Sequence, residues 1–186
     1  MIDEIQEQGV KTEKVWSSAE IQDLVNNLGS KDGILRVKSR NKLVSVGTAA
    51  VPALKEALSD KNQWCRWEAA KALGEIASPE ATDALINSLE DKSFDVRWLA
   101  AEALVAIGSA VDLPMLQVLV NKSDSIWIRE GAHHIFHGLI NKNRFIQTLR
   151  PVLLALEDIY DSYNVTFAAR KALDSMESIG RRSEPE

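Results

Sequence analysis

The chain has 186 residues, of which 45% are hydrophobic and 26% charged, and its formal net charge is −5 at pH 7. This composition is typical of one globular domain, and the acidic balance disfavours nonspecific binding to nucleic acids. The single Cys65 excludes an internal disulfide, which is typical of a reducing compartment. Neither a secretory signal nor a long apolar run is visible, so we expect a cytoplasmic protein without membrane contact.

One segment recurs along the whole sequence. Its clearest copies are CRWEAAKALGEIA (65–77) and VRWLAAEALVAIG (96–108), and its weaker copies are LRVKSRNKLVSVG (35–47), IREGAHHIFHGLI (128–140) and VTFAARKALDSME (165–177). One position of it holds Arg36, Arg66, Arg97, Arg129 and then Thr166, at spacings of 30, 31, 32 and 37 residues. The segments between these copies share a leucine at positions 24, 54, 85, 116 and 153. Two series with nearly equal spacing predict an internal repeat.

Each repeat unit is expected to contain two helices. In the recurring segment, the apolar residues fall one before the arginine and three, six, seven and ten after it. In the second copy these are Cys65, Ala69, Ala72, Leu73 and Ile76. This spacing follows one face of a helix that turns about 100° per residue, and the alternation typical of strands is absent.

Residues that favour helix ends flank several copies of the segment. Asp60, Asp91 and Asp124 precede the second helices and are expected to cap their N-termini. Gly47 and Gly108 follow two of these helices and are expected to end them.

In chain order we therefore expect a polar segment over residues 1–17, a single repeat domain over 18–180 and a disordered tail over 181–186. The repeats are expected at about 18–47, 48–78, 79–109, 110–141 and 142–180. The fifth repeat is longer and would close the array, or else form a weak homodimer of an otherwise monomeric protein through an exposed end.

The pattern [VI]-R-x-x-A-x-x-A-L-x-x-[IL]-G, carried by residues 96–108 and nearly by 65–77, resembles the HEAT repeat. The resemblance is specifically to the short HEAT-like repeats associated with phycobilisome lyase subunits. It implies an all-α, right-handed α-α superhelix of about five helical hairpins, with the second helices along a concave groove. It says little about function, because such repeats serve scaffolds, lyase subunits and a few enzymes.

The series of arginines Arg36, Arg66, Arg97 and Arg129, here called the arginine ladder, is expected to be structural. Guanidinium groups that bond acidic side chains or helix-end carbonyls of neighbouring repeats would hold the stack together.

The positions one, five and eight after the ladder arginine lie opposite the apolar face, so the resemblance places them in the groove. Trp67, Trp98 and Phe167 share the first of these positions, and exposed tryptophans in adjacent repeats are typical of partner-binding hot spots. The same rings would be structural if they covered the arginine ladder or gaps between repeats. The candidate partner-binding residues are Trp67, Trp98, Glu102, Glu130, His134 and Phe167.

All three histidines lie in one copy, IREGAHHIFHGLI. His134 and His137 are expected to face the groove, whereas His133 points about 100° away toward a neighbouring repeat. Imidazoles at this spacing beside Glu102 and Glu130 can supply metal ligands, so His134 and His137 are the candidate residues for a metal-dependent alternative. The chain has no His-Glu dipeptide, unlike the di-iron deoxyhypusine hydroxylases on related repeats.

These features predict a non-catalytic scaffold or adaptor that binds another protein through the concave groove, without cofactor, metal or nucleic acid. The alternative is a subunit of a lyase-type enzyme that acts on a tetrapyrrole such as a phycobilin, or a metal-dependent enzyme that uses the groove histidines. Cys65 occupies a core position and is expected to be inert. No phosphate-binding or nucleophile motif occurs.

Overall fold

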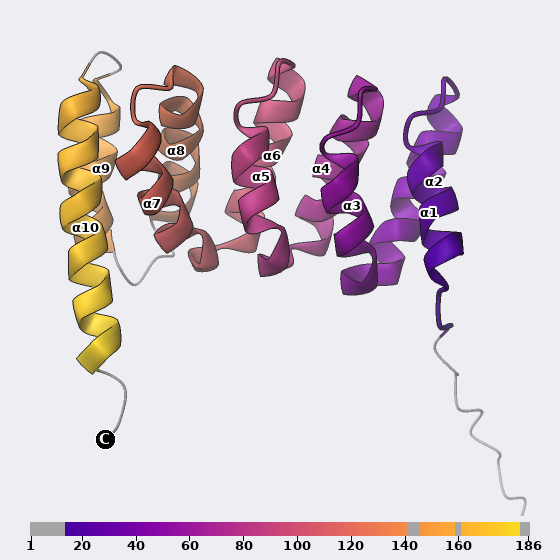
Figure 1. The fold of residues 1–186 in the computed structure, drawn as a ribbon, viewed down its shortest axis with the longest axis horizontal. Helices are drawn as coiled ribbons and strands as arrows, with labels where there is room; N and C mark the ends of the chain where they lie inside the picture. Colours follow the sequence, from indigo (N-terminus) through magenta and orange to yellow (C-terminus); the bar gives the residue numbers. More distant parts are fainter. Residues whose placement is uncertain (1–13, 141–145, 159–160, 183–186) are drawn as a thin grey trace, which may run out of the picture.

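The computed structural model describes residues 14–140, 146–158 and 161–182, and it confirms the all-α helical repeat superhelix within these ranges (Figure 1). The helices are α1 (Ser18–Asn27), α2 (Gly33–Val46), α3 (Val51–Ala57), α4 (Gln63–Ile76), α5 (Thr82–Ser88), α6 (Phe94–Ile107), α7 (Asp112–Lys122), α8 (Ile126–Leu139), α9 (Ile146–Leu156) and α10 (Ser162–Arg182). Short 3-10 turns precede α3, α5 and α7 at Gly47–Ala50, Pro79–Ala81 and Ser109–Val111.

The structure describes only a small part of the two expected end segments. The expected polar segment and disordered tail lie mostly outside the described residues, which begin at 14 and end at 182. The tail was expected from residue 181, but α10 continues through Arg182.

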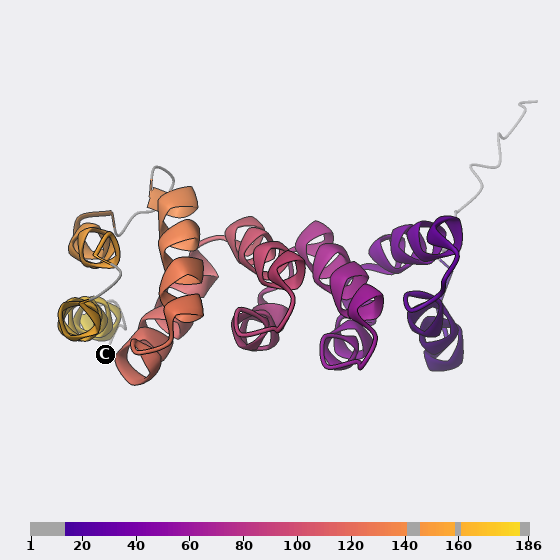
Figure 2. The ribbon, with the colours of Figure 1, turned by 90° about the horizontal axis from the view of Figure 1, so that it is seen from above.

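The helices form two rows, which separate clearly when the molecule is seen from above (Figure 2). In one row, α4 packs against α2 and α6, and α6 packs against α8. The first helices α1, α3, α5 and α7 form the other row. The second helices therefore present a continuous surface from α2 to α8.

In the last helical pair, the first helix α9 lies in the row of second helices and the second helix α10 lies in the row of first helices. α9 packs against α8, and α10 packs against α7 and α9. α10 repeats the second-helix sequence but lies beside the first helices, where it extends the row of α7. Phe167 belongs to α10, so the prediction that it lines the same surface as Trp67 and Trp98 is wrong.

The helix ends follow from local side chains, although not all from those predicted. The predicted N-caps Asp60, Asp91 and Asp124 are wrong, because the cap residues are Asn62, Ser93 and Ser125. Asp60 and Asp91 instead accept hydrogen bonds from the backbone N–H two residues later, at 2.6 and 2.7 Å. These bonds shape the turn before the helix.

The predicted C-caps are confirmed. Gly47 and Gly108 have φ angles of 72° and 85°, which glycine adopts without the penalty of a Cβ atom. Ala77 occupies the corresponding position after α4 and also adopts a left-handed conformation, with φ of 52°.

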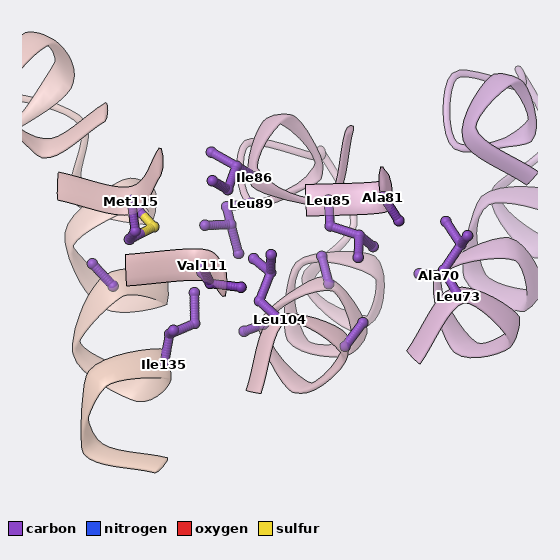
Figure 3. Close-up of a cluster of buried hydrophobic side chains, with 14 of the residues drawn as sticks. Ala70, Leu73, Ala81, Leu85, Ile86, Leu89, Leu104, Val111, Met115 and Ile135 are labelled. Carbon is purple, nitrogen blue, oxygen red and sulfur yellow. The ribbon is translucent and has the colours of Figure 1, made fainter. Parts of the chain in front are cut away.

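The predicted apolar face forms the core. Its residues Cys65, Ala69, Ala72 and Leu73 are buried. Between the two rows of helices, side chains of both rows pack together, including Leu85, Leu104, Met115 and Ile135 (Figure 3). A Cβ atom on Gly74 would lie 3.1 Å from the Cα of Ala103, so α4 and α6 approach closely at this point.

The arginine ladder is structural, as predicted. Nη1 of Arg36, Arg66 and Arg97 each donates a 2.8 Å hydrogen bond to the carbonyl oxygen six residues earlier. Arg129 donates in the same way to the carbonyl of Ser123. These carbonyls belong to the same repeat and not to a neighbouring one, so each arginine fixes the turn between its own two helices.

Carboxylates connect the ladder to the next repeat. Arg66 donates to both carboxylate oxygens of Asp91, at 2.6 and 3.0 Å, from Nε and Nη2. Glu68 lies between Arg36 and Arg40, with 3.5 Å to Nε of Arg36 and 2.6 Å to Nη1 of Arg40. Because Glu68 is 2% exposed, this is a buried ion cluster between α2 and α4.

Among the described residues, no single helix is both long and apolar enough to cross a membrane. One pair bent by 110°, Phe94–Ile107 with Ser109–Lys122, reaches that length and composition only in combination.

Candidate partner-binding surface

Exposed aromatic side chains gather near the N-terminal ends of α4, α6 and α8. They are Trp64, Phe94, Trp98 and Trp127, with exposed fractions of 50%, 63%, 49% and 41%, and they are called the aromatic surface below. Exposed rings of this size, repeated in three successive second helices, mark an interaction site more often than an isolated exposed residue does.

The first part of the aromatic surface lies between α2 and α4. Trp64 and Trp67 meet edge to face, with ring centroids 6.4 Å apart. The guanidinium carbon of Arg36 lies 4.5 Å from the Trp64 ring, and Lys71 Nζ lies 5.2 Å from the Trp67 ring. Trp64 therefore covers Arg36 of the arginine ladder, and the predicted residue Trp67, which meets Trp64, is partly buried.

The second part lies between α6 and α8. Trp98 stacks on Phe94 with a centroid distance of 6.4 Å and approaches the His134 ring at 4.7 Å. Nε2 of His134 hydrogen-bonds Oε1 of Glu102 at 2.7 Å. The structure thus brings together three of the predicted residues, Trp98, Glu102 and His134, across two adjacent repeats.

The same two helices enclose a surface pocket of about 290 Å³. It is lined by Leu89, Phe94, Arg97, Trp98, Ala101, Trp127, Glu130, Gly131 and His134. Arg97 forms one wall, with its guanidinium carbon 4.8 Å from the Trp127 ring and 5.7 Å from the Phe94 ring. The predicted residues Trp98, Glu130 and His134 all contribute to this pocket, whereas Phe167 does not.

His137 is exposed, and its ring stacks on His133 with centroids 6.1 Å apart. His133 lines a separate pocket between α8 and α9 with Leu156 and Glu157. Within the described ranges, no group of three or more His, Cys, Asp or Glu side chains is placed to hold a metal ion.

Cys65 is buried in the core, as predicted. Burial raises the pKa of its thiol to about 11, so the nucleophilic thiolate is scarce at neutral pH.

Four residues of this surface were not predicted: Trp64, Phe94, Arg97 and Trp127. Two of them, Trp64 and Trp127, share the position two before the ladder arginine and cover the arginine of the preceding repeat. The recurrence of tryptophan at that position was the signal that could have identified them.

Comparison with known proteins agrees with the fold. The sequence model of the HEAT repeats matches residues 21–93 and 51–134. Among solved structures, the chain is similar to the complex of CpcE and CpcF of phycocyanin lyase from Nostoc sp. PCC7120. The identity is 25% and the TM-score 0.55, over 84% of this chain and 99% of that chain. An engineered protein is 20% identical with a TM-score of 0.43, over 86% of this chain and 80% of that one. No curated protein matches the sequence. The family match spans more than half of the sequence, and the chain belongs to the HEAT repeat family.

Proposed function

We propose that the chain is a non-catalytic interaction module that docks another protein on the surface of its second helices. The observation that carries this proposal is the aromatic surface, which leaves four large rings about half exposed on three adjacent repeats. Burial of such a ring against a partner is worth about 2 kcal/mol or more when it forms a hot spot.

The surroundings of these rings also suit a protein interface. Charged and polar groups of both signs, such as Arg97, Glu102, Glu130 and His134, lie beside the aromatic rings between α6 and α8. An apolar centre with polar groups around it is the usual composition of a specific interface. The similar solved structure is a complex of two proteins, which supports a role in assembly for this chain.

The test is an affinity pull-down from native lysate, with bound proteins quantified by mass spectrometry. The baits are the wild-type chain, the double variant Trp64→Ala/Trp98→Ala, and the control Leu113→Ala. Leu113 is also an exposed apolar residue, at 40%, but it lies on α7 in the other row.

We expect one or more proteins to bind wild type and Leu113→Ala, and to be lost with the double variant. All three baits should remain equally helical by circular dichroism. If the same proteins bind all three baits in equal amounts, the aromatic rings are only structural and the proposal fails.

A second candidate function is that of a subunit in a lyase-type assembly that handles a linear tetrapyrrole. The observation that favours it is the similarity to the phycocyanin lyase complex over nearly the whole of that solved chain. Titration of the purified chain with phycocyanobilin, followed by visible absorption, tests this role. A saturable spectral shift that stops at one equivalent would support it, and an unchanged spectrum would contradict it.

A further inference from the structure

The pocket lies between the second helices α6 and α8, in a contact region of the kind called a junction below. The corresponding spaces at the junctions of α2 with α4 and of α4 with α6 are filled by side chains. The junctions can be compared at two repeat positions, two and four residues after the ladder arginine. Between α2 and α4, Arg40 and Glu68 occupy these positions and form a 2.6 Å ion pair. Between α4 and α6, the equivalent residues are Ala70, which is buried in the hydrophobic core, and Leu99, which is partly buried and packs against it.

Between α6 and α8, the equivalent residues are Ala101 and Gly131, and both line the pocket. Two large side chains of the first junction are thus replaced by a methyl group and a hydrogen atom. The space of about 290 Å³ follows from these two small residues. Gly131 lies close to Leu89 in the wall of the pocket. A Cβ atom added to Gly131 would lie 3.0 Å from both terminal carbons of the Leu89 side chain.

At this junction, the two positions that supply a carboxylate to the earlier ladder arginines hold other residues. Arg36 faces Glu68 of the next repeat, and Arg66 binds Asp91 of the next repeat through two hydrogen bonds. For Arg97, the position of Glu68 is taken by Gly131, and the position of Asp91 is taken by Ser123.

Ser123 is itself engaged, since its hydroxyl group lies 2.5 Å from that of Thr166 on α10. Arg97 donates to the carbonyl of Asp91 and contacts two aromatic rings, but within the described ranges it forms no ion pair. A guanidinium group with unoccupied donors therefore lines a pocket at the site of the missing carboxylate.

We propose that this pocket receives an acidic side chain of the docked partner protein, whose carboxylate pairs with Arg97. The inference rests on the function proposed above and names the chemistry that the partner must bring. Guanidinium and carboxylate groups form paired hydrogen bonds in one plane, as Arg66 and Asp91 do one repeat earlier. The rings of Trp98 and Trp127 also line the pocket, and a docked partner that covers them would exclude water and strengthen such a pair.

Other charged groups around the pocket define the orientation of the acidic residue. The carboxylate of Glu102 already contacts His134, with 2.7 Å between Oε1 and Nε2. Glu130 is exposed and lines both this pocket and the next one, between α8 and α9, so it stands on the ridge that separates them. Its negative charge opposes an incoming carboxylate, and the acidic side chain must therefore enter on the side of Arg97. Removal of the Glu130 charge should strengthen binding of an acidic residue and weaken binding of a basic one.

The experiment uses random linear peptides displayed on phage and selected on the immobilised wild-type chain. Selected peptides are synthesised, and their affinities are measured by fluorescence anisotropy for wild type, Gly131→Ala, Gly131→Glu, Glu130→Gln and the double variant Trp64→Ala/Trp98→Ala. Gly131→Glu introduces a carboxylate at the position that Glu68 holds two repeats earlier, so it should fill the pocket from within. Gly131→Ala adds the same Cβ atom without the carboxylate and is the matched control.

We expect the selected peptides to share an Asp or Glu, whose replacement by Asn or Gln weakens binding to wild type by about ten-fold or more. Gly131→Glu should bind these peptides about ten-fold more weakly than Gly131→Ala does, while melting at least as high, because its own carboxylate pairs with Arg97. Glu130→Gln should bind them more tightly than wild type.

The inference is overturned if the peptides share no acidic residue, if Gly131→Glu and Gly131→Ala bind them equally, or if Glu130→Gln weakens binding. If one of these outcomes is found and the selected peptides bind Trp64→Ala/Trp98→Ala more weakly than wild type, the proposed docking surface stands and only the acidic pocket fails. If no peptide is selected, or if all variants bind equally, both proposals fail.

Discussion

Replacement of Glu68 by glutamine perturbs the buried ion cluster that joins α2 to α4. The Glu68 carboxylate accepts from Arg40 at 2.6 Å and lies 3.5 Å from Arg36, and Arg40 is only 7% exposed. Glutamine has nearly the same size but no charge, so the Arg40 guanidinium keeps a buried charge without its main counter-charge. Such a loss costs about 3–5 kcal/mol.

Thermal unfolding followed by circular dichroism measures this cost. For a chain of this size, a loss of about 3 kcal/mol corresponds to a fall in Tm of roughly 6–12 °C. Glu75→Gln is the control, because Glu75 also lies 3.5 Å from Arg40 but its side chain is 43% exposed. Its replacement should cost about 1 kcal/mol or less. If both substitutions lower Tm by the same small amount, the buried ion cluster does not stabilise the chain as reasoned.

A rescue experiment tests the same reasoning from the other direction. The double variant Arg40→Ala/Glu68→Leu reproduces the residues Ala70 and Leu99 of the next junction. Apolar residues that replace a buried ion pair are often neutral or stabilising, so we expect a Tm close to that of wild type. A double variant less stable than Glu68→Gln would contradict this expectation.

Three further predictions concern single residues. Ala77→Gly should stabilise the chain by about 0.5–1 kcal/mol in urea unfolding, because the left-handed conformation at φ of 52° is costly for alanine, and a destabilised variant would argue against it. The hydrogen bonds from Lys14 and Ser17 lower the pKa of Glu20 to about 2, so its stabilisation of the α1 N-terminus is complete above about pH 4.5 and is lost as the pH falls toward 2. An NMR titration should show this, whereas an ordinary carboxyl pKa would contradict it. Burial raises the pKa of Cys65 to about 11, so Ellman's reagent should modify it only after unfolding, and rapid modification of the native chain would contradict this.

The repeat period was sufficient to predict the fold. The ladder arginines and the apolar positions around Leu73 recur in step, and a helix of 3.6 residues per turn places them on one face. The same alignment correctly placed Glu102 opposite His134, because equivalent positions of adjacent second helices lie side by side. These predictions rest on geometry within and between regular repeats.

The predictions failed where that regularity ends. α10 has the sequence period of a second helix, but this period does not specify which neighbouring row its apolar face meets, and it packs on α7. Consequently Phe167 was misplaced. His137 is exposed as expected, but its ring stacks on His133, a contact that the alignment of repeats does not show. Trp127 was missed because its ring reaches back over an arginine of the preceding repeat, which a single-helix projection does not show.

The most direct test of the account is site-specific photo-crosslinking in native lysate. p-Benzoylphenylalanine replaces Trp98 in one form of the chain and Leu113 in another, and the two residues lie on different rows with similar exposure. We predict that illumination produces a discrete covalent adduct with another protein from position 98 and none from position 113. Adducts from position 113 alone, or the same adducts from both positions, would contradict a docking surface on the second helices.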